Sequence, residues 1–249
     1  MKRCSLIWRD GLTAVRVMAA VLCACLLAVS CGAVAEEQAA PAILEAALPY
    51  LRQNPATVGW LKVANIVDSP VVKGDGTFYL NHNFYGEKST GGTVFLDEEC
   101  TILPKNDHMV IYGHNMRNGT VFGSLSNYRQ LSYLKANPII DFDTIYEEGK
   151  YVIVAVYDMS AETEDPHFMQ MLHFNFTDNE DFWNFFEFEV QRRNIYDIPV
   201  DVEYGDKLLS LITCSYTLYD GRLIIMCREL RPGEDVQGVT AAMQSAAFR

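Results

Sequence analysis

Three side chains suited to acyl transfer lie at the ends of apolar segments in this sequence. Cys214 and His114 each follow an apolar run, and Arg222 precedes another. A thiolate is a strong nucleophile, an imidazole transfers protons, and a guanidinium stabilises a negative oxygen. Together these residue types favour attack of a sulfur atom on a carbonyl carbon. Taken alone, Cys214 has a simpler interpretation as a small buried hydrophobe, which is the usual state of a free cysteine.

A hairpin is the element that would bring Cys214 and Arg222 together. The turn at residues 219–221 separates two apolar runs, so the second strand should return beside the first. Arg222 would then begin the returning strand next to Cys214. Arg228 shares its strand face, but lies about 20 Å further along at ~3.3 Å per residue. We therefore prefer Arg222 as the partner of the thiol.

Short strands separated by Gly, Pro, Asn and Asp dominate the chain after residue 57. This pattern predicts a β-barrel or a β-sandwich. A short helix is expected at residues 43–51, interrupted by Pro49, and an amphipathic helix after a capping box at Thr177 and Glu180. The predicted strands are Val58–Ile66, Pro70–Val72, Phe78–Leu80, Thr93–Leu96, Met109–Tyr112, Ile139–Phe142, Tyr151–Asp158, Met169–Phe176, Pro199–Val202, Lys207–Thr213 and Arg222–Leu230.

The N-terminus has the features of an export signal. A charge-free apolar run at residues 17–35 follows four basic residues, Lys2, Arg3, Arg9 and Arg16. Its length lies between that of a signal-peptide core and that of a membrane span, and the basic flank should stay in the cytoplasm. We expect one uncleaved N-terminal span in the cell membrane and an extracytoplasmic catalytic domain. Cleavage after Ala35 and lipid attachment at Cys31 are alternatives that would also export the protein.

Composition excludes several other functions. The net charge of −12 argues against nucleic acid as a partner, because phosphate binding needs clustered Lys and Arg. Neither a metal nor an organic cofactor is expected, and the acidic stretch Asp97-Glu98-Glu99 lacks the ligand spacing of a calcium loop. An unpaired thiol outside the cytoplasm is a hazard unless it is needed. Beyond the leader, the odd number of cysteines predicts neither a disulfide framework nor a zinc site: Cys100, Cys214 and Cys227.

The segments around the reactive residues resemble the motifs of class B sortases. The family's histidine motif is similar to residues 112–122, YGHNMRNGTVF. The family's Thr-x-Thr-Cys…Arg signature is similar to Thr213-Cys214 followed by Arg222. The resemblance runs from about residue 54 to residue 230 and includes the acidic-aromatic helix. One departure is Ile212, where the family often has a small hydroxyl residue; it bears on which sorting motif is accepted, not on the reaction class.

This resemblance implies a mostly β fold, a closed eight-stranded sortase-type β-barrel with an N-terminal helix and one inserted amphipathic helix. It implies that Cys214 attacks the threonine carbonyl of a C-terminal sorting signal on a secreted protein and forms a thioester. His114 would exchange protons with the leaving and incoming amines, and Arg222 would stabilise the oxyanion. The acceptor would be an amine of a peptidoglycan precursor of the cell wall. A pilin lysine, in a pilin-polymerising sortase, and a catalytically silent β-barrel binding module are the alternatives.

The same resemblance gives candidates for the substrate groove and a division of the chain. By strand alternation, Tyr112 and Ser210 have the same parity as His114 and Cys214. The full set of substrate-binding candidates is Asn81, Tyr112, Ser210, Thr213 and Tyr216. The expected parts of the chain are a signal or anchor segment at 1–35, a linker with the N-terminal helix at 36–53, the catalytic domain at 54–231 and a flexible tail at 232–249.

Overall fold

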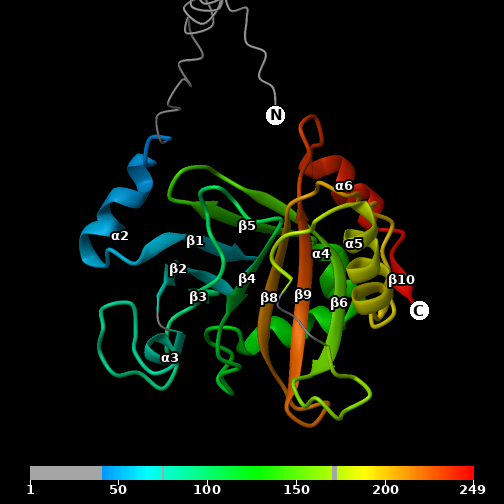
Figure 1. The fold of residues 1–249 in the computed structure, drawn as a ribbon, viewed down its shortest axis with the longest axis horizontal. Coiled ribbons are helices and arrows are strands. Elements are labelled where there is room, and N and C mark those ends of the chain that lie inside the picture. The colour runs from blue at the N-terminus through cyan, green and yellow to red at the C-terminus, as the bar shows by residue number, and fades with distance from the viewer. Residues whose placement is uncertain (1–40, 75, 170–172) are drawn as a thin grey trace, which may run out of the picture. The chain divides into compact units, whose positions relative to one another are not determined.

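A computed structural model describes residues 41–249, except residues 75 and 170–172. In this part of the chain, eight strands close into a barrel in the order β1-β2-β3-β4-β8-β9-β6-β5 (Figure 1). The predicted eight-stranded barrel is therefore confirmed. The barrel strands are β1 (Thr57–Val63), β2 (Val67–Lys73), β3 (Phe95–Leu96), β4 (His108–Tyr112), β5 (Ile139–Thr144), β6 (Lys150–Ser160), β8 (Leu208–Ser215) and β9 (Gly221–Glu229).

Strand direction determines which chain ends meet. The pairs β2–β3 and β4–β8 are parallel, whereas the other neighbours in the barrel are antiparallel. Because β4 and β8 run the same way, both end at the same edge of the barrel. The antiparallel strand β9 begins at that edge. The segment after β4, the end of β8 and the start of β9 therefore lie side by side.

The long strands β6, β8 and β9 form the best covered part of the barrel. All residues of β6 from Tyr151 to Tyr157 are buried, and so are Leu208 to Thr213 of β8. A strand covered on both faces reads as a continuous apolar run, which is the pattern that these segments have in the sequence. Each fully buried Val, Leu or Ile side chain contributes about 1.5–3 kcal/mol relative to an exposed one. This packing makes the strands that end at the site rigid.

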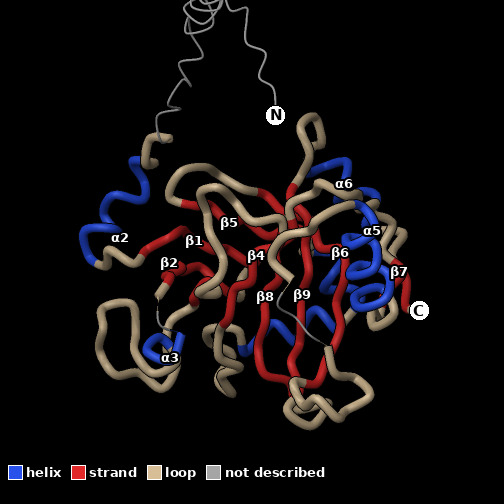
Figure 2. The backbone as a smooth tube through the Cα atoms, in the orientation of Figure 1, coloured by secondary structure: helices blue, strands red, loops and turns tan. Residues whose placement is uncertain are grey.

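Short helices lie around the barrel (Figure 2). Pro49 lies in the first turn of α2, where its missing N–H costs nothing, so it begins this helix and does not interrupt it. The amphipathic helix starts one residue later than expected: Asp178 is its N-cap and accepts a bond from Asp181 N. The helices are η1 (Glu45–Ala47), α2 (Leu48–Gln53), α3 (Gly76–Tyr79), η2 (Gly123–Arg129), α4 (Leu131–Ala136), α5 (Asn179–Trp183), the π-helix η3 (Asn184–Gln191) and α6 (Val236–Met243).

Four segments differ from the expectations. The predicted strand Phe78–Leu80 overlaps the helix α3, and the predicted strand Pro199–Val202 belongs to no strand or helix. In the predicted strand Met169–Phe176, residues 173–176 are not a strand, and residues 170–172 lie outside the described part. The segment expected as a flexible tail contains α6 and β10 (Ala247–Phe248), which pairs with β7 (Tyr196–Asp197). Burial of Met243 and Ala246 explains why this segment packs on the rest of the fold.

The predicted location in the cell membrane is overturned. Across residues 41–249, leaving aside the undescribed positions, no helix is long and apolar enough to cross a membrane. The run at 17–35, which was expected to form the span, lies outside the described residues.

Candidate active site

Cys214 lies at the end of β8 with its side chain exposed. The other two cysteines of the described part, Cys100 and Cys227, are buried. Burial raises the pKa of the Cys100 thiol to about 12 and raises that of Cys227 well above its ordinary value. Both buried thiols therefore stay protonated and unreactive near neutral pH. Cys214 is the thiol that a ligand can reach.

Arg222 lies directly opposite Cys214 in the β8–β9 ladder. Opposed residues of an antiparallel pair point to the same face, with Cβ atoms about 4.5–5.5 Å apart. The predicted hairpin therefore has the register that brings these two side chains together. Nη1 of Arg222 donates to Asp220 Oδ1 at 2.7 Å, Asp220 O at 2.9 Å and Gly221 O at 3.0 Å. These bonds engage one end of the guanidinium group.

His114 follows β4 at the position that continues the β4–β8 register. Tyr112 pairs with Ile212, and Gly113 N donates to Ile212 O at 3.2 Å. One residue further, Asn115 Nδ2 donates to Cys214 O at 2.7 Å. The segment carrying His114 thus stays bonded to the end of β8, at the ~4.8 Å spacing of neighbouring strands.

The imidazole of His114 has a defined hydrogen-bond partner. Its Nε2 lies 2.7 Å from the carbonyl oxygen of Leu80, in the loop after α3. Because a carbonyl oxygen only accepts, Nε2 must carry a hydrogen. In the neutral ring, Nδ1 is then the nitrogen with a free lone pair. The loop after α3 therefore selects the tautomer of His114.

An open cavity of about 630 Å³ lies beside Cys214. Its walls come from the segment after His114, from η2 and from the β8–β9 turn, and they include Arg117 and Arg129. Arg129 pairs with Asp158 and also donates to Ser215 Oγ at 3.0 Å. Ser215 follows Cys214, so this network fixes the backbone beside the thiol. The cavity gives a second molecule access to the sulfur atom.

Of the five substrate-binding candidates, three have side chains that are exposed or half-buried, and two are buried. Tyr216 is 79% exposed and lines the cavity beside Cys214. Asn81 is exposed and follows Leu80, whose carbonyl group holds His114. Tyr112 is half-buried, and its hydroxyl donates to Asp97 Oδ2 at 2.9 Å. Tyr216 is thus beside the thiol, Asn81 follows the residue that holds His114, and Tyr112 is the last residue of β4.

Ser210 and Thr213 do not fit the predicted substrate-binding role. They are only 1% and 3% exposed, respectively. Ser210 Oγ is bonded to His108 Nε2 at 2.8 Å, and Thr213 Oγ1 donates to Gly113 O at 2.8 Å. Both hydroxyls are therefore buried and engaged. Thr213 joins β8 to the segment that carries His114, which is a positioning contact.

Several residues that shape the site were not anticipated from the sequence. Asn115, Asp220 and Arg129 bond to the backbone or side chains next to the reactive groups. Asn115 and Asp220 lie next to or close to His114 and Arg222 in sequence, which is a signal that could have drawn attention to them. Arg129 gives no such signal. Within the described part of the chain, no group of three or more His, Cys, Asp and Glu side chains could hold a metal ion.

Comparison with known proteins gives a consistent result. A sequence model of the sortase domain matches residues 61–230. Sortase B of Listeria monocytogenes is 30% identical over 163 residues, covering 65% of this chain and 63%, just under two thirds, of the relative. Sortase B of Staphylococcus aureus is 26% identical over 182 residues, covering 72% of each chain. The structure of Clostridium perfringens sortase B matches with a TM-score of 0.66 at 29% identity, covering 74% of this chain and 99% of that one.

Proposed function

The chain belongs to the sortase family, with class B sortases as its relatives, and on this basis we propose that it is a cysteine transpeptidase. It would cleave a C-terminal sorting signal after threonine and transfer the secreted protein to an amine of the cell wall. The observation that carries this proposal is the order of the strands β4, β8 and β9. This order supports the assignment of His114, Cys214 and Arg222 to one site at the edge of the barrel.

In the first half of the proposed reaction, Cys214 Sγ attacks the threonine carbonyl carbon. The proton of the thiol resides on His114, and negative charge develops on the carbonyl oxygen. Arg222 donates to that oxygen from the guanidinium nitrogens that Asp220 does not engage. The carbon–nitrogen bond then breaks, the leaving amine takes the proton from His114, and a thioester remains on Cys214.

In the second half, an amine attacks the thioester carbonyl carbon. His114 accepts a proton from the incoming amine, and Cys214 leaves as a thiolate. We assign the proton transfer to Nδ1, because Nε2 donates to the Leu80 carbonyl oxygen. The acceptor in this proposal is a peptidoglycan precursor, and a pilin lysine is the alternative. The cavity beside Cys214 has room for either amine.

We propose that Tyr216, Asn81 and Tyr112 contact the sorting signal. Tyr216 lines the same cavity as Cys214, and Asn81 follows Leu80, whose carbonyl oxygen holds His114. Tyr112 lies two residues before His114 with its ring against Phe95, at a centroid distance of 5.3 Å. These residues frame the reactive groups from three different elements, as a groove for an extended peptide requires.

The proposal is tested by incubating the protein with a fluorogenic sorting-signal peptide, with and without an amine acceptor. Transpeptidation predicts a peptide–acceptor product whose yield rises with acceptor concentration, whereas a strict hydrolase would ignore the acceptor. Mass spectrometry should detect the thioester on Cys214 and should not detect it in Cys214→Ala. Cys227→Ala is a matched control. Cys227 is buried and should carry no adduct, so this variant should still form the thioester on Cys214. An unchanged turnover rate in Cys214→Ala would refute the proposal.

A catalytically silent binding module is the remaining alternative. It predicts that the peptide binds but is never cleaved. The exposure of Cys214 and the bonds that fix its neighbours favour an active site, because a module without chemistry has no need of an accessible thiol. Binding of the peptide without any covalent adduct would favour the silent module.

A further inference from the structure

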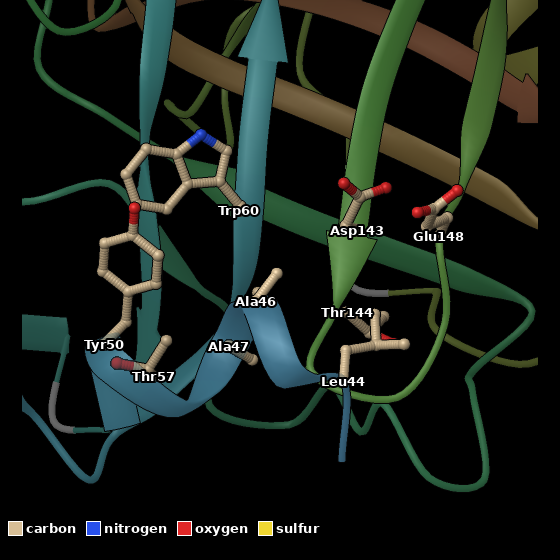
Figure 3. Close-up of a pocket in the computed structure, with 10 residues that line it drawn as sticks. Leu44, Ala46, Ala47, Tyr50, Thr57, Trp60, Asp143, Thr144 and Glu148 are labelled. Carbon is tan, nitrogen blue, oxygen red and sulfur yellow. The ribbon is translucent and has the colours of Figure 1, made fainter. Parts of the chain in front are cut away.

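A second cavity, of about 270 Å³, lies between the N-terminal helices and the strands β1 and β5. Figure 3 shows two facing walls: the rings of Tyr50 and Trp60 on one side and the carboxylates of Asp143 and Glu148 on the other. Aliphatic side chains from η1 and the segment before it complete the cavity, Leu44, Ala46 and Ala47. None of these residues belongs to the site of Cys214.

Strand pairing builds the two walls. Trp60 of β1 lies opposite Asp143 of β5 in an antiparallel ladder, so both side chains project from the same face. The indole is fixed on both sides: its Nε1 donates to Asp68 Oδ1 at 2.7 Å, and its ring centroid lies 4.3 Å from that of Tyr50. The aromatic wall is thus preformed. A group that enters the cavity therefore meets aromatic rings on one side and carboxylates on the other.

The carboxylates of this cavity have no cationic partner at ion-pair distance in the described part of the chain. Asp143 Oδ1 accepts from Gly149 N at 3.1 Å, and Glu148 is exposed. Lys150 pairs instead with Asp141, at 2.8 Å. The bond to Asp141, with added effects of Asp143 and Glu148, raises the pKa of Lys150. A cation near these carboxylates is therefore stabilised.

The size and composition of the cavity restrict the ligand. Its volume lies below the ~300–1,000 Å³ of cavities that take whole drug-sized molecules. Two carboxylates on their own do not make a metal site, and no larger metal-binding group occurs among the described residues. An aliphatic stem would fit against the leucine and alanine side chains. A cationic head would meet both the aromatic rings and the carboxylates.

We propose that this cavity binds the side chain of a lysine in a peptide or protein partner. The four methylene groups of the lysine pack against Leu44, Ala46 and Ala47. The ammonium group lies over the indole of Trp60 and between Asp143 and Glu148. The negative charge of the chain, −12, favours the approach of such a basic segment.

Isothermal titration calorimetry with two short peptides tests this site. The probes are acetyl-Gly-Lys-Gly-amide and the same peptide with norleucine, which keeps the stem and lacks the ammonium group. The lysine peptide should bind at least about tenfold more tightly, and its affinity should fall as salt concentration rises. Equal affinity of the two peptides would overturn the proposal and leave only an apolar cleft.

Variants then locate the binding. Asp143→Asn combined with Glu148→Gln should lower the affinity for the lysine peptide by about tenfold or more, while the new amide side chain still offers an oxygen to Gly149 N. Glu148→Gln alone changes an exposed side chain and should give a smaller loss in an intact fold. Glu162→Gln with Glu164→Gln removes the same charge from a different loop and should have no effect. An unchanged affinity in the Asp143/Glu148 variant would place the peptide elsewhere.

Discussion

At the scale of single residues, two arginines on one strand differ in burial and in their partners. Arg222 has a partly exposed side chain, and Asp220 and two backbone carbonyl groups engage only its Nη1. The remaining N–H groups of its fork are left for a ligand. Arg228 is fully buried and bonds to Glu234 through Nη1 at 2.6 Å and Nη2 at 2.7 Å. Arg222 is therefore available for chemistry, whereas Arg228 is committed to the fold.

Replacement of Arg222 by alanine should slow thioester formation by about 10²–10³-fold, because the oxyanion loses its charged donor. Arg222→Lys should recover only part of the rate, since an ammonium group lacks the planar fork of donors. Single-turnover acylation by the sorting-signal peptide measures the effect. Arg52→Ala removes an exposed arginine from α2 and is the control. An acylation rate in Arg222→Ala equal to that of the wild type would exclude Arg222 from the reaction.

The pairing of Arg222 with Cys214 in the β8–β9 ladder could be predicted because the two residues are close in sequence. A tight turn and the two-residue strand period are enough to place the two opposite each other. The same reasoning fails for Ser210, although its parity matches that of Cys214. Its burial depends on His108 and on residue 173, which are distant in sequence. Long-range covering segments of this kind leave no periodic signal in the strand that they cover.

At the scale of elements, His108 joins β4, β8 and the segment before α5. Its Nε2 bonds to Ser210 Oγ at 2.8 Å, and its Nδ1 bonds to the carbonyl oxygen of His173 at 2.9 Å. The ring also lies 5.6 Å from that of Phe185, centroid to centroid. The sequence suggests a solvated loop residue here, because His108 follows Lys105, Asn106 and Asp107. Burial instead lowers the pKa of His108 to about 4.

The stability of the fold should depend on pH through His108. The unfolded chain takes up a proton at this histidine near pH 6.5, whereas the folded chain resists protonation down to about pH 4. The free energy of unfolding therefore decreases as pH falls through this window, by about 3 kcal/mol in total. His108→Gln lacks this contribution, so its difference from the wild type should change between pH 7 and pH 4. Urea unfolding at several pH values measures the free energy of unfolding of both proteins. A difference between them that does not change with pH would contradict a buried, neutral His108.

The order and type of the longer elements could be predicted, but the irregular ones could not. The central parts of β8 and β9 are mostly apolar, and each strand matches its prediction within a few residues. Residues 76–79 contain Thr, Phe and Tyr, which favour strands, yet they form the helix α3. The position of this helix depends on tertiary contacts such as Asn54 Nδ2 to Tyr79 Oη at 3.2 Å. For this reason, the hydrogen bond between His114 and the Leu80 carbonyl oxygen could not be predicted from the sequence.

At the scale of the whole molecule, a network of charges attaches the C-terminal segment and the loop before β8 to the barrel. Arg228 of β9 donates from Nε to Asp201 O at 2.8 Å and binds Glu234 with both terminal nitrogens. Arg231 pairs with Asp201 and Asp206. These contacts explain why the end of the chain is held in place beyond the last barrel strand. A buried guanidinium without its carboxylate would be strongly unfavourable.

Loss of the Glu234 charge should therefore destabilise the entire domain. Glu234→Gln should lower the free energy of unfolding by about 1.5–3 kcal/mol at pH 7, the range for hydrogen bonds to charged groups. The bonds from Arg228 lower the pKa of Glu234 from its ordinary value of 4.5. Its stabilisation is therefore complete above pH 4.5 and is lost as pH falls through the lowered folded-state pKa. Urea unfolding of both proteins should show a difference in the free energy of unfolding that is wide at pH 7 and narrows as pH falls well below 4.5. A difference in the free energy of unfolding that stays constant with pH would show that Glu234 acts through packing and not through its charge.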